Sequence, residues 1–133
     1  ALQVAAMQRD CIELQNQAQT EDGTVERSFL HVLDACDAVL IALNWLKTQT
    51  SCLEAFNIAH HQLTSIQNLI DEVARVTQTE IQVQPAVYQN QELAQLGANI
   101  DKAKKILNWV PKRSLSQMIE DEWRFYRNTL TGN

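Results

Sequence analysis

The residue best placed to do chemistry in this sequence is Arg27, which follows a turn-forming run at residues 21–23 and precedes a run rich in alanine and leucine. A guanidinium on a short strand that feeds a buried helix suits a phosphate group, because it donates charge-assisted hydrogen bonds to anionic oxygens. The only glycines are Gly23, Gly97 and Gly132, so a glycine-rich phosphate loop is absent. The chain therefore has features of one half of an active site, although a single arginine of this kind, taken by itself, is more often a solvated strand-edge charge.

Three other groups of residues could in principle bind a metal or take part in catalysis. His60 and His61 near Cys52 suggest a metal site, but adjacent residues point apart and no second ligand pair with zinc spacing exists, so no metal is predicted. His31 falls on the strand predicted over residues 26–32 and is expected to be a packed or capped histidine. Tyr88 and Tyr126 are the only tyrosines, and neither has a lysine four positions later.

A basic run near the C-terminus raises the question of nucleic acid. Residues 102–113 hold five of the 11 lysines and arginines, while the whole chain carries a net charge of −5. Nucleic-acid binding needs clustered cations, and a solvated helix face is the more usual reading of such a run. The five residues are Lys102, Lys104, Lys105, Lys112 and Arg113. No nucleic-acid partner is expected.

Composition is that of a globular chain. Of 133 residues, 45% are hydrophobic and 20% charged, enough for one unit with a real core. No apolar run is long enough for a membrane span, and the N-terminus lacks a signal-peptide layout. The initial Ala, in place of Met, suggests a fragment or a processed chain. Three cysteines without CxxC spacing, Cys11, Cys36 and Cys52, indicate reduced thiols and a cytoplasmic location.

Hydrophobic periodicity predicts mostly helix with three short strands. A weak helix over Leu2–Ile12 and a loop over Glu13–Gln19 precede a strand over Glu26–Val32. The next helix, Leu33–Leu46, is apolar on nearly all sides and should be buried on most of its surface. A second strand is expected over Cys52–Ile58.

The second half of the sequence is also predicted to alternate between helices and strands. Thr64 and Gln67 have capping-box spacing before a helix whose apolar residues are Ile66, Leu69, Ile70, Val73 and Val76. A strand is predicted over Glu80–Gln84 and a polar stretch over Tyr88–Gln95. A short helix is predicted in which Ile100, Ala103, Ile106 and Leu107 share a face, and Trp109, Val110 and Pro111 close it. The last helix opens at Ser114, with Gln117 three residues on, and buries Leu115, Met118, Ile119, Trp123 and Tyr126 or Phe125.

The order of several motifs resembles one family. Residues 20–39, TEDGTVERSFLHVLDACDAV, resemble the segment TEDGT-x-x-RDYIHV-x-DLA of UDP-glucose 4-epimerases, which are extended short-chain dehydrogenases/reductases of the NAD-dependent epimerase/dehydratase family. The other matching motifs are Gln3-Val4-Ala5, Phe56-Asn57-Ile58, Thr64-Ser65-Ile66, Asp101-Lys102-Ala103, Ile106-Leu107-Asn108-Trp109, Pro111, Ser114-Leu115, Met118-Ile119, Asp121 and Trp123. The resemblance covers essentially the whole chain, but only the C-terminal part of the family's length.

The resemblance implies a fold and roles for particular residues. It implies an α/β unit over residues 1–133, predominantly helical, that is the C-terminal substrate-binding part of such an enzyme and lacks most of the Rossmann sheet. Arg27 matches an arginine that contacts the nucleotide diphosphate. Glu92 stands where the family has an aspartate that contacts the nucleotide, and Gln89 where it has a second phosphate-binding arginine. Ser28, Ala59 and His61 are further departures from the family pattern.

The resemblance also implies what this chain does not carry. The dinucleotide-binding loop, the Tyr-x-x-x-Lys pair and the catalytic serine of the family lie upstream of the matched part. NAD is therefore expected in that missing portion, and this chain alone is expected to be inactive. Its implied partners are a UDP-sugar, the missing Rossmann portion and a second copy of the intact enzyme. A rival hypothesis is a diverged, non-catalytic structural or protein-interaction module.

Overall fold

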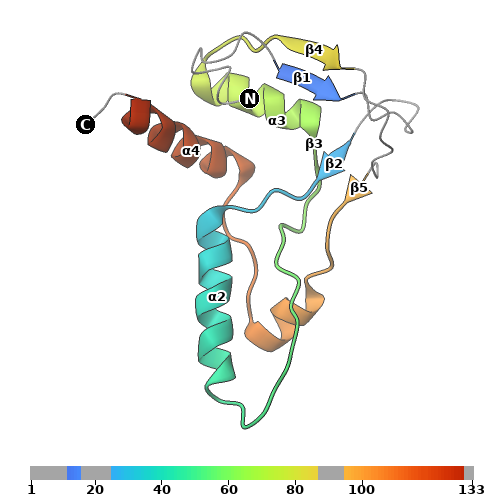
Figure 1. Cartoon of the computed structure of the whole chain (residues 1–133), viewed down its shortest axis with the longest axis vertical. Coiled ribbons are helices and arrows are strands. Elements are labelled where there is room, and N and C mark those ends of the chain that lie inside the picture. The colour runs from blue at the N-terminus through green and yellow to red at the C-terminus, as the bar shows by residue number, and fades with distance from the viewer. Residues whose placement is uncertain (1–11, 16–24, 87–94, 131–133) are drawn as a thin grey trace.

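The computed structural model describes residues 12–15, 25–86 and 95–130, and Figure 1 shows their arrangement. Two small sheets and the pair α3–α4 form the upper half of the view, and α2 runs down the lower half beside an extended segment and a π-helical turn. The elements are β1 (Ile12–Gln15), β2 (Glu26–Arg27), α2 (Val32–Leu46), β3 (Thr64–Ser65), α3 (Ile66–Thr77), β4 (Val83–Ala86), β5 (Gln95–Leu96), η1 (Ala103–Leu107) and α4 (Leu115–Leu130).

The strands form two separate sheets. β1 pairs in parallel with β4, from Ile12 opposite Val83 to Gln15 opposite Ala86. This pairing corrects two predictions, because residues 13–15 are a strand rather than a loop and the strand expected at 80–84 instead spans 83–86. The rest of the predicted loop and the helix at residues 2–11 lie outside the described residues. In the second sheet β2 is central, antiparallel to β3 and parallel to β5.

The helices α3 and α4 pack against each other through one apolar core. Val73 and Ile119 are 2% and 3% exposed, and the partly buried Leu69, Leu115 and Trp123 surround them. Both helices begin with a side-chain cap. Ser65, rather than the predicted Thr64, accepts a hydrogen bond from the Asn68 backbone N–H (3.0 Å), because α3 begins at Ile66 and Ser65 is the residue that directly precedes it. α4 has the predicted capping box.

In that capping box, the Ser114 backbone N–H donates to Gln117 Oε1 (3.0 Å), and the Gln117 N–H donates to Ser114 Oγ (3.2 Å). The helix then buries Ile119 and partly buries Trp123 and Tyr126, as predicted, whereas Phe125 is 66% exposed. The reciprocal bonds satisfy two groups at the helix terminus, which is why this signal could be read from sequence.

A second core lies between α2 and η1. Ala38, Ala103, Leu107 and Trp109 are buried there, and Phe56 and Ile58 pack against them. The predicted short helix is thus present, but its π-helical turn leaves Ile106 40% exposed. A π-turn has more residues per turn than an α-helix, so it changes which side chains share a face.

Two predicted strands are corrected by the structure. The strand expected over Glu26–Val32 covers only Glu26–Arg27, because its partners β3 and β5 are equally short and α2 begins at Val32. The stretch Cys52–Ile58 is no strand, since no backbone hydrogen bond joins it to another described residue. A strand requires a neighbour, and this one has none in the described chain.

The burial of α2 also differs from expectation. Only Asp34 and Ala38 are buried, whereas Val39 is 58% and Leu40 is 60% exposed.

Within the described ranges, no helix is long and apolar enough to cross a membrane.

Candidate functional site

Arg27 lies in the central strand of the second sheet and is partly buried. In the ladder it stands opposite Thr64 on one side and Leu96 on the other. Its Nη1 donates to the Glu26 carbonyl oxygen at 2.9 Å. Glu26 in turn accepts a 2.6 Å hydrogen bond from Gln95 Nε2, which ties β2 to β5 through side chains. The arginine is therefore held on a strand that is paired along both edges.

The other two predicted site residues, Gln89 and Glu92, lie outside the described residues. The structure does describe both ends of the stretch that carries them. That stretch follows β4 and leads directly into β5, and Glu92 lies three positions before Gln95. Because β5 pairs with β2 at Arg27, the chain enters the ladder beside Arg27 soon after Glu92.

Ser28, which stands where the family has an aspartate, connects the end of β2 to the loop at His60, before β3. Its backbone N–H donates to the Leu96 carbonyl (3.2 Å), and its Oγ donates to the His60 carbonyl (2.9 Å). The neighbouring Ala59 is buried at 8% exposure. His60 and His61 stack with their ring centroids 4.6 Å apart. Ser28 thus has a positioning contact that is independent of any ligand.

His31 is buried, as predicted, but it is the N-cap of α2 rather than a strand residue. Its Nδ1 accepts a hydrogen bond from the Leu33 backbone N–H (3.0 Å), and its Nε2 lies 3.2 Å from Asp121 Oδ2. Because Nδ1 accepts from the backbone, the ring proton resides on Nε2 and is donated to Asp121. Both ring nitrogens are therefore engaged in structural contacts, and no lone pair is left for general-base chemistry.

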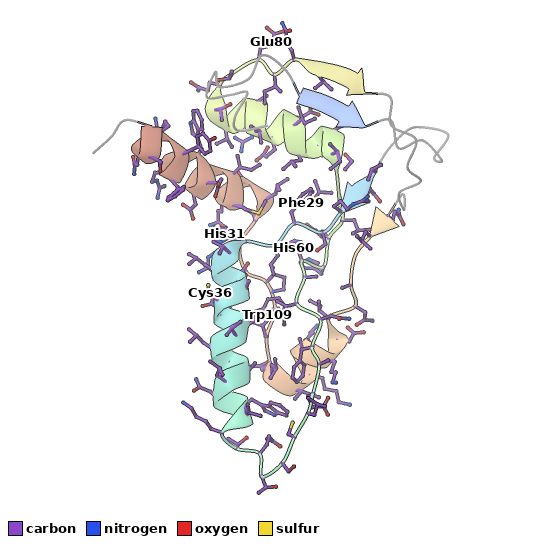
Figure 2. The ribbon with its side chains drawn as sticks, in the orientation of Figure 1. Phe29, His31, Cys36, His60, Glu80 and Trp109 are labelled. Carbon is purple, nitrogen blue, oxygen red and sulfur yellow. The ribbon has the colours of Figure 1, made fainter. Side chains whose placement is uncertain are left out.

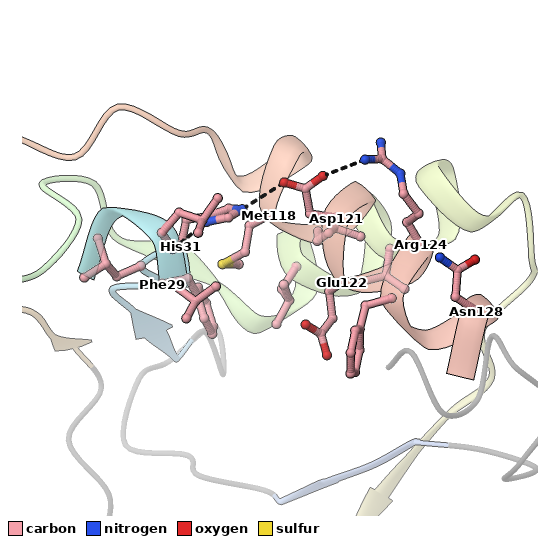
Figure 3. A pocket seen from close by; sticks show the side chains of 14 residues that line it. Phe29, His31, Met118, Asp121, Glu122, Arg124 and Asn128 are labelled. Atoms are coloured by element: carbon pink, nitrogen blue, oxygen red, sulfur yellow. Dashed lines mark hydrogen bonds and ion pairs between the residues drawn. The ribbon is translucent and has the colours of Figure 1, made fainter. Parts of the chain in front are cut away.

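A groove of about 960 Å³ opens between the start of α2, α3 and α4. Figure 3 shows its lining, with His31 and Arg124 joined through Asp121. Its floor is mostly apolar and includes Leu69, Val73 and Ile119. Phe29, two positions beyond Arg27, lines both this groove and a smaller cavity of about 270 Å³ that holds His60 and Lys112.

The polar centre of the described chain is Asp34, which sequence reasoning missed. This carboxylate is 1% exposed. Its Oδ2 accepts from the backbone N–H groups of Lys112 (3.1 Å) and Arg113 (3.0 Å), and its Oδ1 accepts from Arg113 Nη1 (2.5 Å). Burial alone would raise the pKa of Asp34, but the hydrogen bonds from Arg113 and Lys112 outweigh burial and lower it.

Asp34 joins α2 to the loop before α4. Its backbone carbonyl accepts from Trp109 Nε1 (3.1 Å), and Asp37 accepts a second bond from Arg113 Nη1 (3.2 Å). An aspartate inside a strongly apolar helix was the available signal, because a buried charge requires a partner. The partner stands 79 positions away, so spacing could not reveal it.

The basic run does not form one uniform patch. Lys102 pairs with Glu54 and lies over the Phe56 ring, 5.1 Å from its centroid. Arg113 is occupied by Asp34 and Asp37. The lysines of this run are exposed, which agrees with the predicted solvated face.

The sequence is similar to a family model and to several known enzymes. A family model described as GDP-mannose 4,6 dehydratase matches residues 2–122. The UDP-glucose 4-epimerase of Mycoplasma pneumoniae is 34% identical over 111 residues, a match that covers 82% of this chain and 33% of that enzyme. The UDP-glucose 4-epimerase of Halalkalibacterium halodurans is 32% identical over 128 residues and is covered to 38%. The chain thus spans little more than a third of the length of these relatives.

Two solved structures superpose on nearly the entire length of this chain. A UDP-glucose-4-epimerase from Stenotrophomonas maltophila, with bound NAD and formylated UDP-arabinopyranose, superposes on 99% of this chain with a TM-score of 0.89 and 25% identity. Another UDP-glucose 4-epimerase superposes with a TM-score of 0.88 and 30% identity. In these cases 39% and 40% of the larger chain is matched.

Proposed function

This chain belongs to the NAD-dependent epimerase/dehydratase family and is UDP-glucose 4-epimerase-like, and from that premise we propose that it is the UDP-sugar-binding, C-terminal portion of an epimerase. In this role Arg27 donates hydrogen bonds to the diphosphate, and Gln89 and Glu92 contribute from the stretch that leads into β5. A guanidinium offers several donors in one plane, which suits two neighbouring phosphate groups.

One observation carries the proposal: β5 pairs with β2 in register at Arg27 and Leu96. The pairing brings the chain that follows Gln89 and Glu92 to the strand of Arg27, although more than sixty positions separate them in sequence. The extended backbone of β2 is held on both edges, which limits the entropy lost when a ligand binds.

The residues of this chain do not fit a dinucleotide. NAD binding by this family's fold uses a glycine-rich turn at a helix N-terminus, and the chain has only three scattered glycines. We therefore place NAD, and the hydride transfer that it supplies, in the portion of the polypeptide outside this chain. The part played by this chain is to bind and orient the nucleotide-sugar.

The test uses a hybrid enzyme in which this chain replaces the stretch of the Halalkalibacterium halodurans epimerase that it matches. UDP is titrated into the hybrid and into its Arg27→Ala variant by calorimetry. Loss of a charge-assisted phosphate contact should cost about 1.5–3 kcal/mol, roughly ten-fold or more in affinity. Arg27→Lys should recover part of the loss, because it restores the charge without the planar donors.

Arg124→Ala is the matched control, since Arg124 is exposed on α4 and pairs only locally with Asp121 among the contacts described. It should leave UDP affinity unchanged. Equal affinity of the Arg27→Ala variant and the unmodified hybrid would remove Arg27 from the site. A hybrid that binds NAD but has no measurable affinity for UDP would support the rival hypothesis of a diverged, non-catalytic module.

A further inference from the structure

The smaller cavity, of about 270 Å³, lies between the loop before β3 and the loop that leads into α4, and we call it the loop cavity. Figure 2 shows two of its lining residues, Phe29 and His60, in the middle of the view. Pockets for small molecules usually enclose about 300–1,000 Å³. The loop cavity therefore suits a ligand as small as a single phosphate group.

The lining of the loop cavity is basic. Two histidines, one lysine and one arginine line it, and no aspartate or glutamate stands among its ten described lining residues. The whole chain has 16 acidic and 11 basic residues, so this lining departs from the average charge of the sequence. The four basic residues are His60, His61, Lys112 and Arg113. A cavity of this composition favours an anion, because no carboxylate at its wall repels one.

Lys112 supplies the positive charge of the cavity. Its side chain is exposed, and no described residue pairs with its ammonium group. Its backbone N–H donates to the buried Asp34 carboxylate at 3.1 Å, which holds the residue at the edge of the cavity. Arg113 adds little net charge, because its Nη1 already pairs with Asp34 and Asp37. The lysine is therefore a cation on a fixed backbone, without a counter-charge in the described chain.

The two histidines add ring N–H donors on the opposite loop. His60 Nδ1 accepts from the Gln62 backbone N–H at 3.2 Å, so the neutral ring carries its proton on Nε2, where it is a donor. No described residue accepts from that nitrogen. The His60 carbonyl accepts from Ser28 Oγ (2.9 Å), and the His61 ring stacks on the His60 ring with the centroids 4.6 Å apart. The loop therefore holds both rings in place without a ligand.

We propose that the loop cavity binds a phosphate group, either as inorganic phosphate or as the phosphate of a small monoester. Lys112 supplies the charge, and the ring N–H groups of His60 and His61 donate to the phosphate oxygens. Hydrogen bonds to an ionised acceptor are about twice as strong as neutral ones, and a phosphate has enough oxygens to accept from both loops at once. Arg27 does not line this cavity, so phosphate binding here is independent of the proposed UDP-sugar site.

Nuclear magnetic resonance of the histidine rings tests the proposal directly, because the chain has only three histidines. Inorganic phosphate is titrated into the 133-residue chain at constant pH and constant ionic strength, with chloride as the balancing anion. The ring signals of His60 and His61 should shift along a saturating curve. His31 is 4% exposed and both of its ring nitrogens are engaged, so its signals should stay fixed and serve as the internal reference.

Substitution of two lysines tests which residue supplies the charge. Lys112→Ala should raise the dissociation constant for phosphate about ten-fold or more, because it removes a charge-assisted contact. Lys112→Arg keeps the charge and should restore most of the affinity. Lys104→Ala is the matched control and should leave the dissociation constant unchanged, since Lys104 is an exposed lysine of the same basic run that does not line the cavity. Neither lysine side chain has a described partner, so both alanine variants should fold.

Phenyl phosphate, titrated in the same way, distinguishes the two sources of the phosphate group. A dissociation constant below that of inorganic phosphate would assign the cavity to a monoester, whose organic group would lie beside Phe29. An equal or higher constant would assign it to inorganic phosphate. The comparison of Lys112→Ala with Lys104→Ala is repeated by calorimetry in the hybrid enzyme that carries Arg27→Ala, and it decides the matter even if the isolated chain does not fold.

Three results would overturn the proposal. The first is a titration in which the signals of His60 and His61 move no more than those of His31. The second is an equal dissociation constant for phosphate in Lys112→Ala and Lys104→Ala. The third is loss of phosphate binding in the Arg27→Ala variant, because the anion would then lie at the proposed diphosphate site. Phosphate binding that survives Arg27→Ala would keep the loop cavity as a site even if Arg27 proves to have no role in UDP binding.

Discussion

The two halves of the molecule contrast in how completely they cover their apolar residues. In the upper half, α3 and α4 bury Val73 and Ile119 against each other, and both helices carry side-chain caps. In the lower half, α2 buries one side against η1 and leaves Val39 and Leu40 exposed. The pair α3–α4 therefore buries its shared apolar face within the described chain, whereas α2 packs against other described elements on one side only.

The two halves also use different polar anchors. The lower half depends on Asp34, a buried carboxylate that holds the loop before α4 through three hydrogen bonds. The upper half is joined at its surface, where Arg75 bonds both Glu72 and Ser116. A buried anchor is costly to break because it leaves an uncompensated polar group, while a surface anchor is screened by water.

The largest effect is expected from Asp34→Ala, which leaves the Lys112 and Arg113 backbone N–H groups without their acceptor. Breaking a buried ionic network of this kind should lower the free energy of unfolding by about 3–5 kcal/mol, measured by urea denaturation. Asp37→Ala removes the more exposed partner of the same arginine, so it should cost less than about 1 kcal/mol. Similar losses in the two variants would show that the buried carboxylate has no special role.

A matched pair of valines compares the two helices directly. Val73→Ala should lower the free energy of unfolding by about 2 kcal/mol, because the residue is 2% exposed and its methyl groups leave a cavity. Val39→Ala should change it by less than about 0.5 kcal/mol in the isolated chain, since the residue is 58% exposed. Chemical denaturation of both variants measures the difference, and equal costs would contradict the view that the outer side of α2 is uncovered.

The start of α2 should depend on its histidine cap. His31→Ala removes the acceptor for the Leu33 N–H and should cost about 1 kcal/mol, with a loss of helical signal by circular dichroism. His31→Asn is the control, because asparagine is among the best N-cap residues and should restore most of the stability. If alanine and asparagine behave alike, then the contribution of His31 lies in its contact with Asp121 rather than in the cap.

The smallest expected effect is a loss of folding stability at acidic pH. The side-chain hydrogen bond from Arg75 lowers the pKa of Glu72 from 4.5 to about 2. Since the folded state favours the ionised form, this stabilisation is fully present above pH 4.5 and is lost as the pH falls towards 2. Urea midpoints at a series of pH values should therefore fall more steeply over this window in the unmodified chain than in Glu72→Gln. Parallel curves would show that the pair contributes no acid dependence.

An element could be predicted from the sequence when the residues that stabilise it lie close together along the chain. The helices α2, α3 and α4 were identified because their periodicity and caps are local, as with Ser114 and Gln117. The strands were predicted less well. The stretch Cys52–Ile58 has the composition of a strand but no backbone partner among the described residues. The strand β1 was not predicted because its partner β4 lies far along the chain. Asp34 was missed for the same reason.

The family, the positions of α2, α3 and α4 and the choice of Arg27 as the residue to test follow from the sequence, because these depend on residue types and short spacings. The folded chain was needed to show that β5 lies beside Arg27, that Asp34 anchors the loop before α4, and that one side of α2 is uncovered. These features depend on which distant segments meet in space. The cause is physical: hydrogen-bond partners and burial are properties of the packed chain, and no local pattern specifies them.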